Sequence, residues 1–268
     1  MPSVDSGRQR VRLSGAHLDV AARVLEGRPV TADLAVARDE LQDAGLLPGG
    51  ATHPLLADLI RDLAAAQVTL DIEVAGRDGT STHGAVLTGS RCWLSQGWVG
   101  SEESEYALID PRLLPSAVGL VIGLHQHGEP AGAAAEVRTT LEGLDAAFAA
   151  RGDIEAALDG GADLAGVAGA VRDAVAALPA GSPELGAVVA AERCAWRVTS
   201  ASRAGADVVV RGLAVLDARE HGLWERVAPA EPLRDGRPAP DTEVVLVRRT
   251  PADLWRSLGA LLPGGGAR

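Results

Sequence analysis

The sequence contains neither lysine nor asparagine, so all 25 of its basic residues are arginines. Both missing residues have A/T-rich codons, so their absence indicates a GC-rich genome, and the arginines then reflect codon usage rather than phosphate binding. Because the P-loop motif requires a lysine, this chain cannot contain one. We therefore interpret the glycine-rich segment 160–166 as a turn between helices.

Aromatic side chains are also scarce, at 3% of the residues against 47% hydrophobic residues overall, so the core must consist mainly of leucine, valine and alanine. Positive charge is not clustered either: the formal net charge is −11, and the arginines form nothing larger than a pair such as Arg248–Arg249. Proteins that bind nucleic acids usually carry a basic surface that displaces counterions from phosphates. The composition therefore predicts no nucleic-acid partner and no binding to anionic lipid.

Long apolar runs are missing as well. The longest, 117–124, is too short to cross a bilayer, and the polar start 1–6 has no apolar region typical of a secretory signal. Cys92 and Cys194 lie in apolar surroundings, where we expect two buried thiols, although a disulfide between the two halves of the chain is an alternative. These features predict a soluble cytoplasmic protein without membrane insertion.

The common catalytic motifs for serine nucleophiles, zinc and dinucleotides do not occur in a suitable context. The pair His125 and His127 could ligate a metal, but no acidic residue or cysteine stands nearby at ligand spacing. We interpret the pair as an exposed helix end, where histidine interacts favourably with the helix dipole. The sequence therefore predicts no metal site and no cofactor.

Two groups of residues could nevertheless carry chemistry. Cys92 could be a nucleophile with His83 as its base, but nothing in the sequence orients the pair, and a cysteine in a strand usually belongs to the core. Asp217, Glu220 and His221 could act as acids and bases in a hydrolase, but turns are commonly acidic and polar. We therefore predict no catalytic residues and a protein that is not an enzyme.

What the sequence does contain is one pattern of elements that occurs twice. Residues 53–124 and 182–262 each read as a helix, four strands with alternating apolar residues, and a second helix. In both, the last helix follows an oxygen-bearing N-cap and a proline, Asp110–Pro111 and Thr250–Pro251. The pattern predicts an α+β fold with an internal pseudo-two-fold repeat.

The rest of the chain reads mainly as helix. The middle segment 131–180 is rich in alanine, and its apolar residues from Val137 to Leu178 have the spacing of two or three short helices. Thr31 can cap a helix that runs to Ala44 and ends at Gly45. We expect residues 1–10 to be frayed, and we expect 228–241 to form a long connection.

This order of elements resembles the EspG family, the cytosolic chaperones of type VII (ESX) secretion systems in mycobacteria and other actinobacteria. The resemblance covers about 13–263. It is carried by the segment 41–46, the alanine-rich middle, the strand 211–217, and the strand 244–247 with its proline-capped helix. It implies a single domain over 1–268, with a central, mostly antiparallel sheet and helical bundles. The implied partner is a helical secretion substrate, such as a PE–PPE-type heterodimer or a WXG100-like protein.

The sequence places the partner-binding residues in turns. We predict that they are Arg77 and Asp78 in one turn, Trp98 and Val99 between glycines, and Asp217, Glu220 and His221 in a third segment. Trp98 is the expected interface anchor, whereas Trp93 and Trp224 are read as core residues. Segment 76–82, where the family often has a long loop, is short, so the substrate can differ from PE–PPE proteins.

Two predictions remain open at this point. The oligomeric state is either monomer or homodimer. The alternative function is a transcriptional regulator in which two helices and a strand pair within 31–75 form a winged helix. The charge argues against this alternative, because Arg38 and Arg61 in that segment stand among acidic residues.

Overall fold

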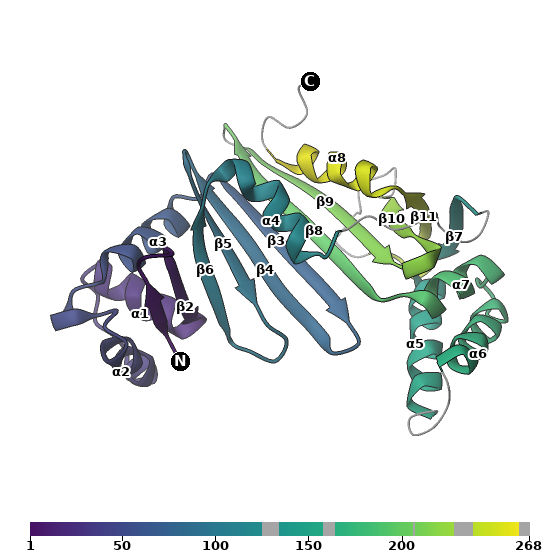
Figure 1. Ribbon diagram of the computed structural model, residues 1–268, viewed down its shortest axis with the longest axis horizontal. Coiled ribbons are helices and arrows are strands. Elements are labelled where there is room, and N and C mark those ends of the chain that lie inside the picture. Colours follow the sequence, from purple (N-terminus) through teal and green to yellow (C-terminus); the bar gives the residue numbers. More distant parts are fainter. Residues whose placement is uncertain (125–133, 158–163, 206, 228–237, 263–268) are drawn as a thin grey trace. The chain divides into compact units, whose positions relative to one another are not determined.

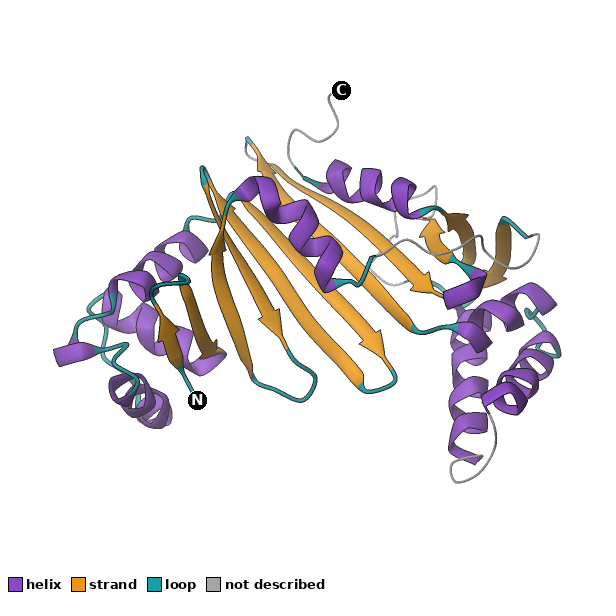
Figure 2. Ribbon diagram, in the orientation of Figure 1, coloured by secondary structure: helices purple, strands orange, loops and turns teal. Residues whose placement is uncertain are grey.

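The computed structural model describes residues 1–124, 134–157, 164–205, 207–227 and 238–262 (Figure 1). It is an α+β fold, as predicted (Figure 2). The elements are β1 (Ser3–Asp5), β2 (Arg10–Ser14), α1 (Gly15–Leu25), η1 (Ala32–Leu34), α2 (Ala35–Asp43), η2 (Pro48–Gly50), α3 (Pro54–Ala64), β3 (Val68–Gly76), β4 (Gly79–Thr88), β5 (Arg91–Gly97), β6 (Glu103–Ile109), η3 (Pro111–Leu113), α4 (Leu114–Val121), β7 (Glu136–Thr140), α5 (Leu141–Ala157), α6 (Leu164–Ala176), α7 (Pro183–Ala191), β8 (Cys194–Ala204), β9 (Asp207–Asp217), η4 (Arg219–His221), β10 (Leu223–Val227), β11 (Glu243–Arg249) and α8 (Pro251–Leu261).

The strands follow the order β1-β2-β6-β5-β4-β3-β8-β9-β10-β11-β7 in one sheet. The pairs for which a register is resolved, such as β3 with β4 and β10 with β11, are antiparallel. The prediction of a large, mostly antiparallel sheet is therefore confirmed. The chain divides into a first unit (Met1–Leu124, Arg197–Gly212 and Ser257–Arg268) and a second unit (His125–Trp196 and Leu213–Arg256).

In the first unit, alternating side chains of β3, β4 and β5 fill one face of the sheet, on which α4 packs against β5. The buried side chains on this face are Val68, Leu70, Ile72, Ala85, Cys92 and Leu94. The opposite face packs against α1, α2 and α3 through a core that includes Val11, Leu13, Leu41 and Trp93. The indole N–H of Trp93, a core residue as predicted, donates to Asp62 Oδ2 at 2.8 Å.

The end of α2 follows the prediction, but its start does not. Gly45 has a φ of 69°, and the amide of Leu46 donates to the carbonyl of Leu41 at 2.8 Å, which is the bond expected of a Schellman end. Thr31 precedes the short helix η1 and makes no side-chain capping hydrogen bond, and α2 starts only at Ala35. The predicted single helix from Thr31 is therefore two helices.

The expectation that residues 1–10 fray is wrong. Ser3–Asp5 forms β1, which pairs antiparallel with β2, and β2 pairs in turn with β6. The physical reason is alternation: Val11 and Leu13 are buried, whereas Arg10 and Arg12 point to the other face. This short amphipathic strand is hidden in a polar sequence because only two of its residues are apolar.

In the second unit, α5, α6 and α7 share one hydrophobic core with side chains of β7, β9, β10 and β11. Within 134–157 and 164–180, the structure has the helices α5 and α6, but it also has β7, which pairs with β11. Val137 therefore belongs to a strand, and the prediction of helix there is wrong. Thr139, two residues later, is also buried, so the local period is that of a strand.

The same order of elements occurs in α3 to α4 and in α7 to α8, namely a helix, four strands and a helix. The predicted caps occur in both: Asp110 accepts a hydrogen bond from the amide of Arg112 at 2.9 Å, and Thr250 Oγ1 accepts one from the amide of Asp253 at 3.1 Å. A pseudo-two-fold relation and the half-repeats 53–124 and 182–262 within a single domain stay predictions. Much of segment 228–241 lies outside the described residues.

Candidate protein-binding surface

Two of the predicted binding segments meet in the first unit. Arg77 and Asp78 form the exposed turn between β3 and β4, and Trp98 and Val99 follow β5. Gly79, which has a φ of 119°, lies so close to Val99 that a Cβ atom on the glycine would stand 2.8 Å from Val99 Cγ1. The hairpin end and the loop after β5 are therefore in direct contact.

The Trp98 ring contacts Arg12 on one side and is accessible to solvent on the other. The Cζ atom of Arg12 lies 4.8 Å from the centroid of the Trp98 ring, which is the geometry of a cation–π interaction. The side chains of Trp98 and Val99 are nevertheless 44% and 47% exposed. An aromatic ring that is fixed before binding loses little conformational entropy on contact with a partner, as expected for an interface anchor.

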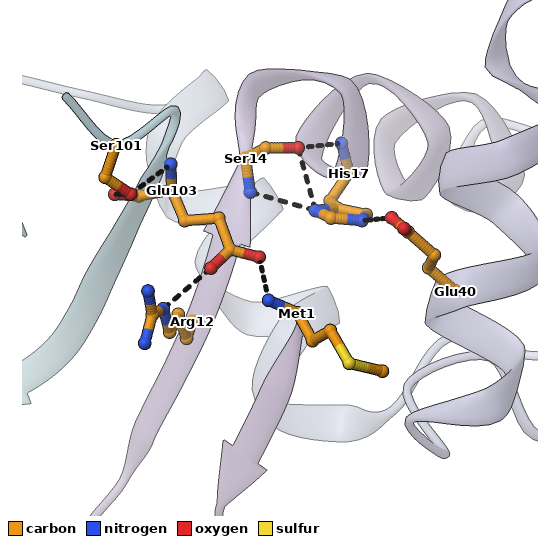
Figure 3. A network of polar contacts seen from close by, with 7 residues as sticks. All are labelled: Met1, Arg12, Ser14, His17, Glu40, Ser101 and Glu103. Atoms are coloured by element: carbon orange, nitrogen blue, oxygen red, sulfur yellow. Dashed lines mark hydrogen bonds and ion pairs between the residues drawn. The ribbon is translucent and has the colours of Figure 1, made fainter.

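A network of polar contacts fixes Arg12 and the loop after Trp98 (Figure 3). Arg12 Nε lies 2.8 Å from Glu103 Oε2, and the other carboxylate oxygen of Glu103 contacts the amino group of Met1. Ser101 Oγ accepts a hydrogen bond from the amide of Glu103 at 3.1 Å. The hydrogen bond from the Met1 amino group lowers the pKa of Glu103; burial opposes this shift, and the charge of Arg12 reinforces it.

A second group of polar contacts joins β2 to α1 and α2. The amide of Ser14 donates to Nδ1 of the buried His17 at 2.9 Å, so that nitrogen is an acceptor and Nε2 carries the proton. His17 Nε2 then donates to Glu40 Oε2 at 2.8 Å (Figure 3). These bonds tie the start of α1 to α2 and so stabilise β2, the strand that carries Arg12.

Beside Trp98, a row of polar residues crosses four strands. In the antiparallel register, Arg12 on β2 lies opposite Glu105 on β6. Glu105 lies opposite Gln96 on β5, and Gln96 lies opposite His83 on β4. The row lies two residues farther along the strands than the buried Leu94, on the same face of the sheet. It offers hydrogen-bond donors and acceptors next to an exposed ring, a combination common in protein interfaces.

His83 is half-buried, like the other members of this row. Its Nε2 lies 2.9 Å from Ser81 Oγ, and its buried Nδ1 has no hydrogen-bond partner within the described part of the chain. Burial lowers the pKa of His83, so the ring is neutral at neutral pH. It can therefore donate or accept one hydrogen bond without contributing charge.

The third predicted binding segment lies in the second unit and has a different character. Asp217 is only 1% exposed, and its Oδ2 lies 2.5 Å from Arg193 Nη2 while its Oδ1 accepts from the amide of Arg219 at 3.0 Å. Asp217 was predicted as a partner-binding residue, but its carboxylate is buried and closes the turn. Glu220 is exposed, and the half-buried His221 accepts a hydrogen bond from the Trp224 indole at its carbonyl, 3.0 Å away.

The cysteines and His83 do not form the nucleophile–base pair that the sequence offers. Cys92 and Cys194 are free and buried, and burial raises the pKa of Cys92 to about 12 and that of Cys194 above its usual value. His83 pairs with Gln96, whereas Cys92 pairs with Leu87, four residues away along the same strands. Four residues of strand span about 13 Å, too far for a base to reach the thiol.

Metal binding and DNA binding also lack a structural basis in the described residues. In the described ranges, His, Cys, Asp and Glu residues nowhere gather in a group of three that could hold a metal ion. The pair His125 and His127 and the segment 158–163 lie outside those ranges. Strands β3 and β4 have neighbours on both sides, β8 and β5, so they do not form the free two-stranded wing of a winged helix.

Sequence reasoning did not identify Arg12, Gln96 or Glu105 as part of this surface. Arg12 was assigned to no element, although its alternation with Val11 and Leu13 indicates a strand. The other two could not be found without the strand order, because β2 pairs with β6 across 89 or more positions of chain.

Among the helices that the structure describes, none is both long and apolar enough to span a membrane.

Comparison with known proteins supports the fold. No protein-family model matches the sequence. No curated protein matches it either. Among solved structures, the chain is similar to the Mycobacterium tuberculosis type VII secretion system chaperone EspG5, solved in complex with the PE25–PPE41 dimer. The TM-score is 0.57 at 12% identity, and the match covers 96% of this chain and 98% of that chain. At this identity the likeness shows an EspG-like fold.

Proposed function

We propose that this protein is a non-enzymatic chaperone that binds a helical secretion substrate of a type VII secretion system in the cytoplasm. The observation that carries the proposal is the match to EspG5 over nearly the whole of both chains. Because the match covers 96% of this chain and 98% of that chain, it involves most of the fold rather than one common motif.

The surface around Trp98 gives the proposal a physical mechanism. A chaperone of this kind must cover an apolar helix tip of its substrate and needs no chemistry for that task. The exposed ring of Trp98 and the side chain of Val99 provide the apolar contact, and the polar row from Arg12 to His83 provides the surrounding hydrogen bonds. Arg77 and Asp78 directly precede Gly79, which contacts Val99, and so lie at the border of this surface.

The proposal is tested by reconstitution with a PE–PPE-type heterodimer or a WXG100-like protein as the candidate substrate. We expect the full-length protein and the heterodimer, expressed together, to elute from a sizing column as one stoichiometric complex. Static light scattering then gives the mass of that complex. Separate elution of the two at micromolar concentration would contradict the proposal.

A matched pair of variants connects the complex to the surface. Trp98→Ala removes the expected anchor, and Trp255→Ala removes a ring of nearly equal exposure, 43% against 44%, from helix α8. Only the first variant should weaken the complex. Equal loss in both variants would separate binding from the Trp98 surface without affecting the proposed class of partner.

A further inference from the structure

Helix α4 has two apolar faces, and only one of them is used within the first unit. Leu114, Val118 and Ile122 point inward and are at most 3% exposed. On the other side, Leu113 is 58% exposed and Leu120 is 82% exposed, although both are large apolar side chains. The inward face alone attaches α4 to the sheet, so the outward leucines are not needed for folding.

The outward apolar residues have the spacing of a helix-binding seam. Leu113, the last residue of η3 and the N-cap of α4, is followed at intervals of four and three residues by Ala117 and Leu120. This spacing places them along one line of the helix, as at the a and d positions of a coiled coil. We call these three residues the α4 seam; it stops at Leu120, because α4 ends at Val121 and Gly123, with a φ of 64°, turns the chain before Leu124. No charged residue occurs between Leu113 and Leu124.

Other surface helices of the same unit differ from α4. Helix α3 presents Asp58 and Arg61 to solvent, and these side chains form an ion pair at 3.1 Å. Helix α2 has one strongly exposed apolar residue, Val36, followed by the ion pair between Arg38 and Asp39 at 2.8 Å. A helix that faces only water normally carries such charges, so the α4 seam is unusual.

We propose that the α4 seam binds an amphipathic helix of the secretion substrate, with the leucines packing between the apolar residues of that helix. The inference rests on the proposed function and adds a second contact to the Trp98 surface. The substrate helix should carry apolar residues at the same four–three spacing, because that spacing keeps two helices in register.

The small area of the α4 seam and the net charge of the chain favour a different protein over a second copy of this chain as the partner that binds the seam. A stable homodimer buries about 800 Å² on each partner, and a seam of two leucines and an alanine over about two helical turns offers only a fraction of that. A second copy of the chain would also bring a net charge of −11 against an equal charge. The seam therefore suits one part of a larger interface with a different protein.

The test uses a synthetic amphipathic helix of about three heptads, with leucine at its a and d positions and a fluorescent label. The full chain carries Leu120→Glu in one variant and Leu113→Glu in a second, and Val36→Glu is the control for adding charge to an exposed apolar position. Fluorescence anisotropy should show binding to the wild type and to V36E. The affinity should fall about tenfold or more in L120E and L113E.

Several results would overturn the inference. They are no binding of the peptide to the wild type, equal binding to L120E, an equal loss in V36E, or a wild-type homodimer that L120E dissociates. Titration with the substrate heterodimer separates this inference from the proposed function. If W98A weakens that complex and L120E does not, only the seam is wrong; if no complex forms, the proposed function is wrong.

Discussion

The loop after β5 and the turn before β10 look alike in sequence but use their side chains differently. Both follow a strand and combine polar residues with a nearby tryptophan. In the loop, Trp98 is 44% exposed, and its other side contacts Arg12, whose Cζ atom lies 4.8 Å from the ring centroid. In the turn, Asp217 is 1% exposed, and its carboxylate forms an ion pair with Arg193 and accepts a hydrogen bond from a backbone amide.

The loop therefore presents an exposed surface that can bind a partner, whereas the polar groups of the turn make contacts that stabilise the fold. A carboxylate that is buried and paired stabilises its own turn, and its removal leaves the partner charge without compensation. An exposed ring on a fixed support contributes little to folding and is free to contact another protein. Changes in the turn should therefore affect stability, whereas changes in the loop should affect binding.

The largest effect should come from Asp217→Ala. The variant leaves Arg193 unpaired and the Arg219 amide without its acceptor, and it should lower the free energy of unfolding by about 2–3 kcal/mol. This value is below that of a fully buried pair, because the Arg193 side chain is 38% exposed. Urea denaturation measures it, with Glu220→Ala as the exposed control. A change in the free energy of unfolding below about 0.5 kcal/mol in both variants would contradict the proposed stabilising role of the turn.

The next effect concerns binding rather than stability. Trp98→Ala should weaken the complex with the substrate heterodimer by about 1–2 kcal/mol or more, with little change in the unfolding midpoint. Isothermal titration calorimetry provides the affinity. Trp255→Ala is the matched control, and unchanged affinity in W98A would reduce Trp98 to a packing role.

A smaller effect is expected from Arg12→Met, which keeps most of the side-chain volume but removes the charge over the Trp98 ring. Loss of the cation–π contact should cost about 0.5–1 kcal/mol of binding, because the ring is no longer fixed. The same titration measures it. In the W98A background, Arg12→Met should cause a smaller loss than in the wild type, and fully additive losses would mean that Arg12 acts independently of the ring.

The smallest effect depends on pH. The pKa of Glu103 is lowered in the folded protein, so its contribution to stability is present above the unfolded pKa of about 4.3 and is lost as the pH falls through the folded value. Glu103→Gln should therefore be less stable than the wild type at pH 7 by about 0.5 kcal/mol, since its partners are largely exposed. The difference should vanish in acid, and a constant difference from pH 7 to pH 2.5 would contradict it.

Much of the fold could be predicted from the sequence because local signals were strong. The alternation of Val68, Leu70 and Ile72 predicted β3, and Gly45 with Leu46 predicted the end of α2. The strands β1, β2 and β7 were missed because each is short and gains its stability from long-range pairing, such as Val137 with Leu246. No local pattern encodes such pairing.

The candidate site could be predicted only in part. Trp98 stood out because a large ring between glycines is unusual, and it is exposed as expected. The burial of Asp217 could not be foreseen, because a turn aspartate reads the same whether its partner is water or Arg193. Which residues meet Trp98 depends on strand order, and the sequence pattern does not contain that information.

The most direct test of the account is hydrogen exchange of the full chain with and without the substrate heterodimer. We predict slower exchange in the loop 98–102, in the hairpin end 76–82 and in α4, with no change in the turn 217–222. Protection confined to the turn 217–222, or no protection anywhere at saturating heterodimer, would contradict the claim that this chain binds its substrate through the Trp98 surface.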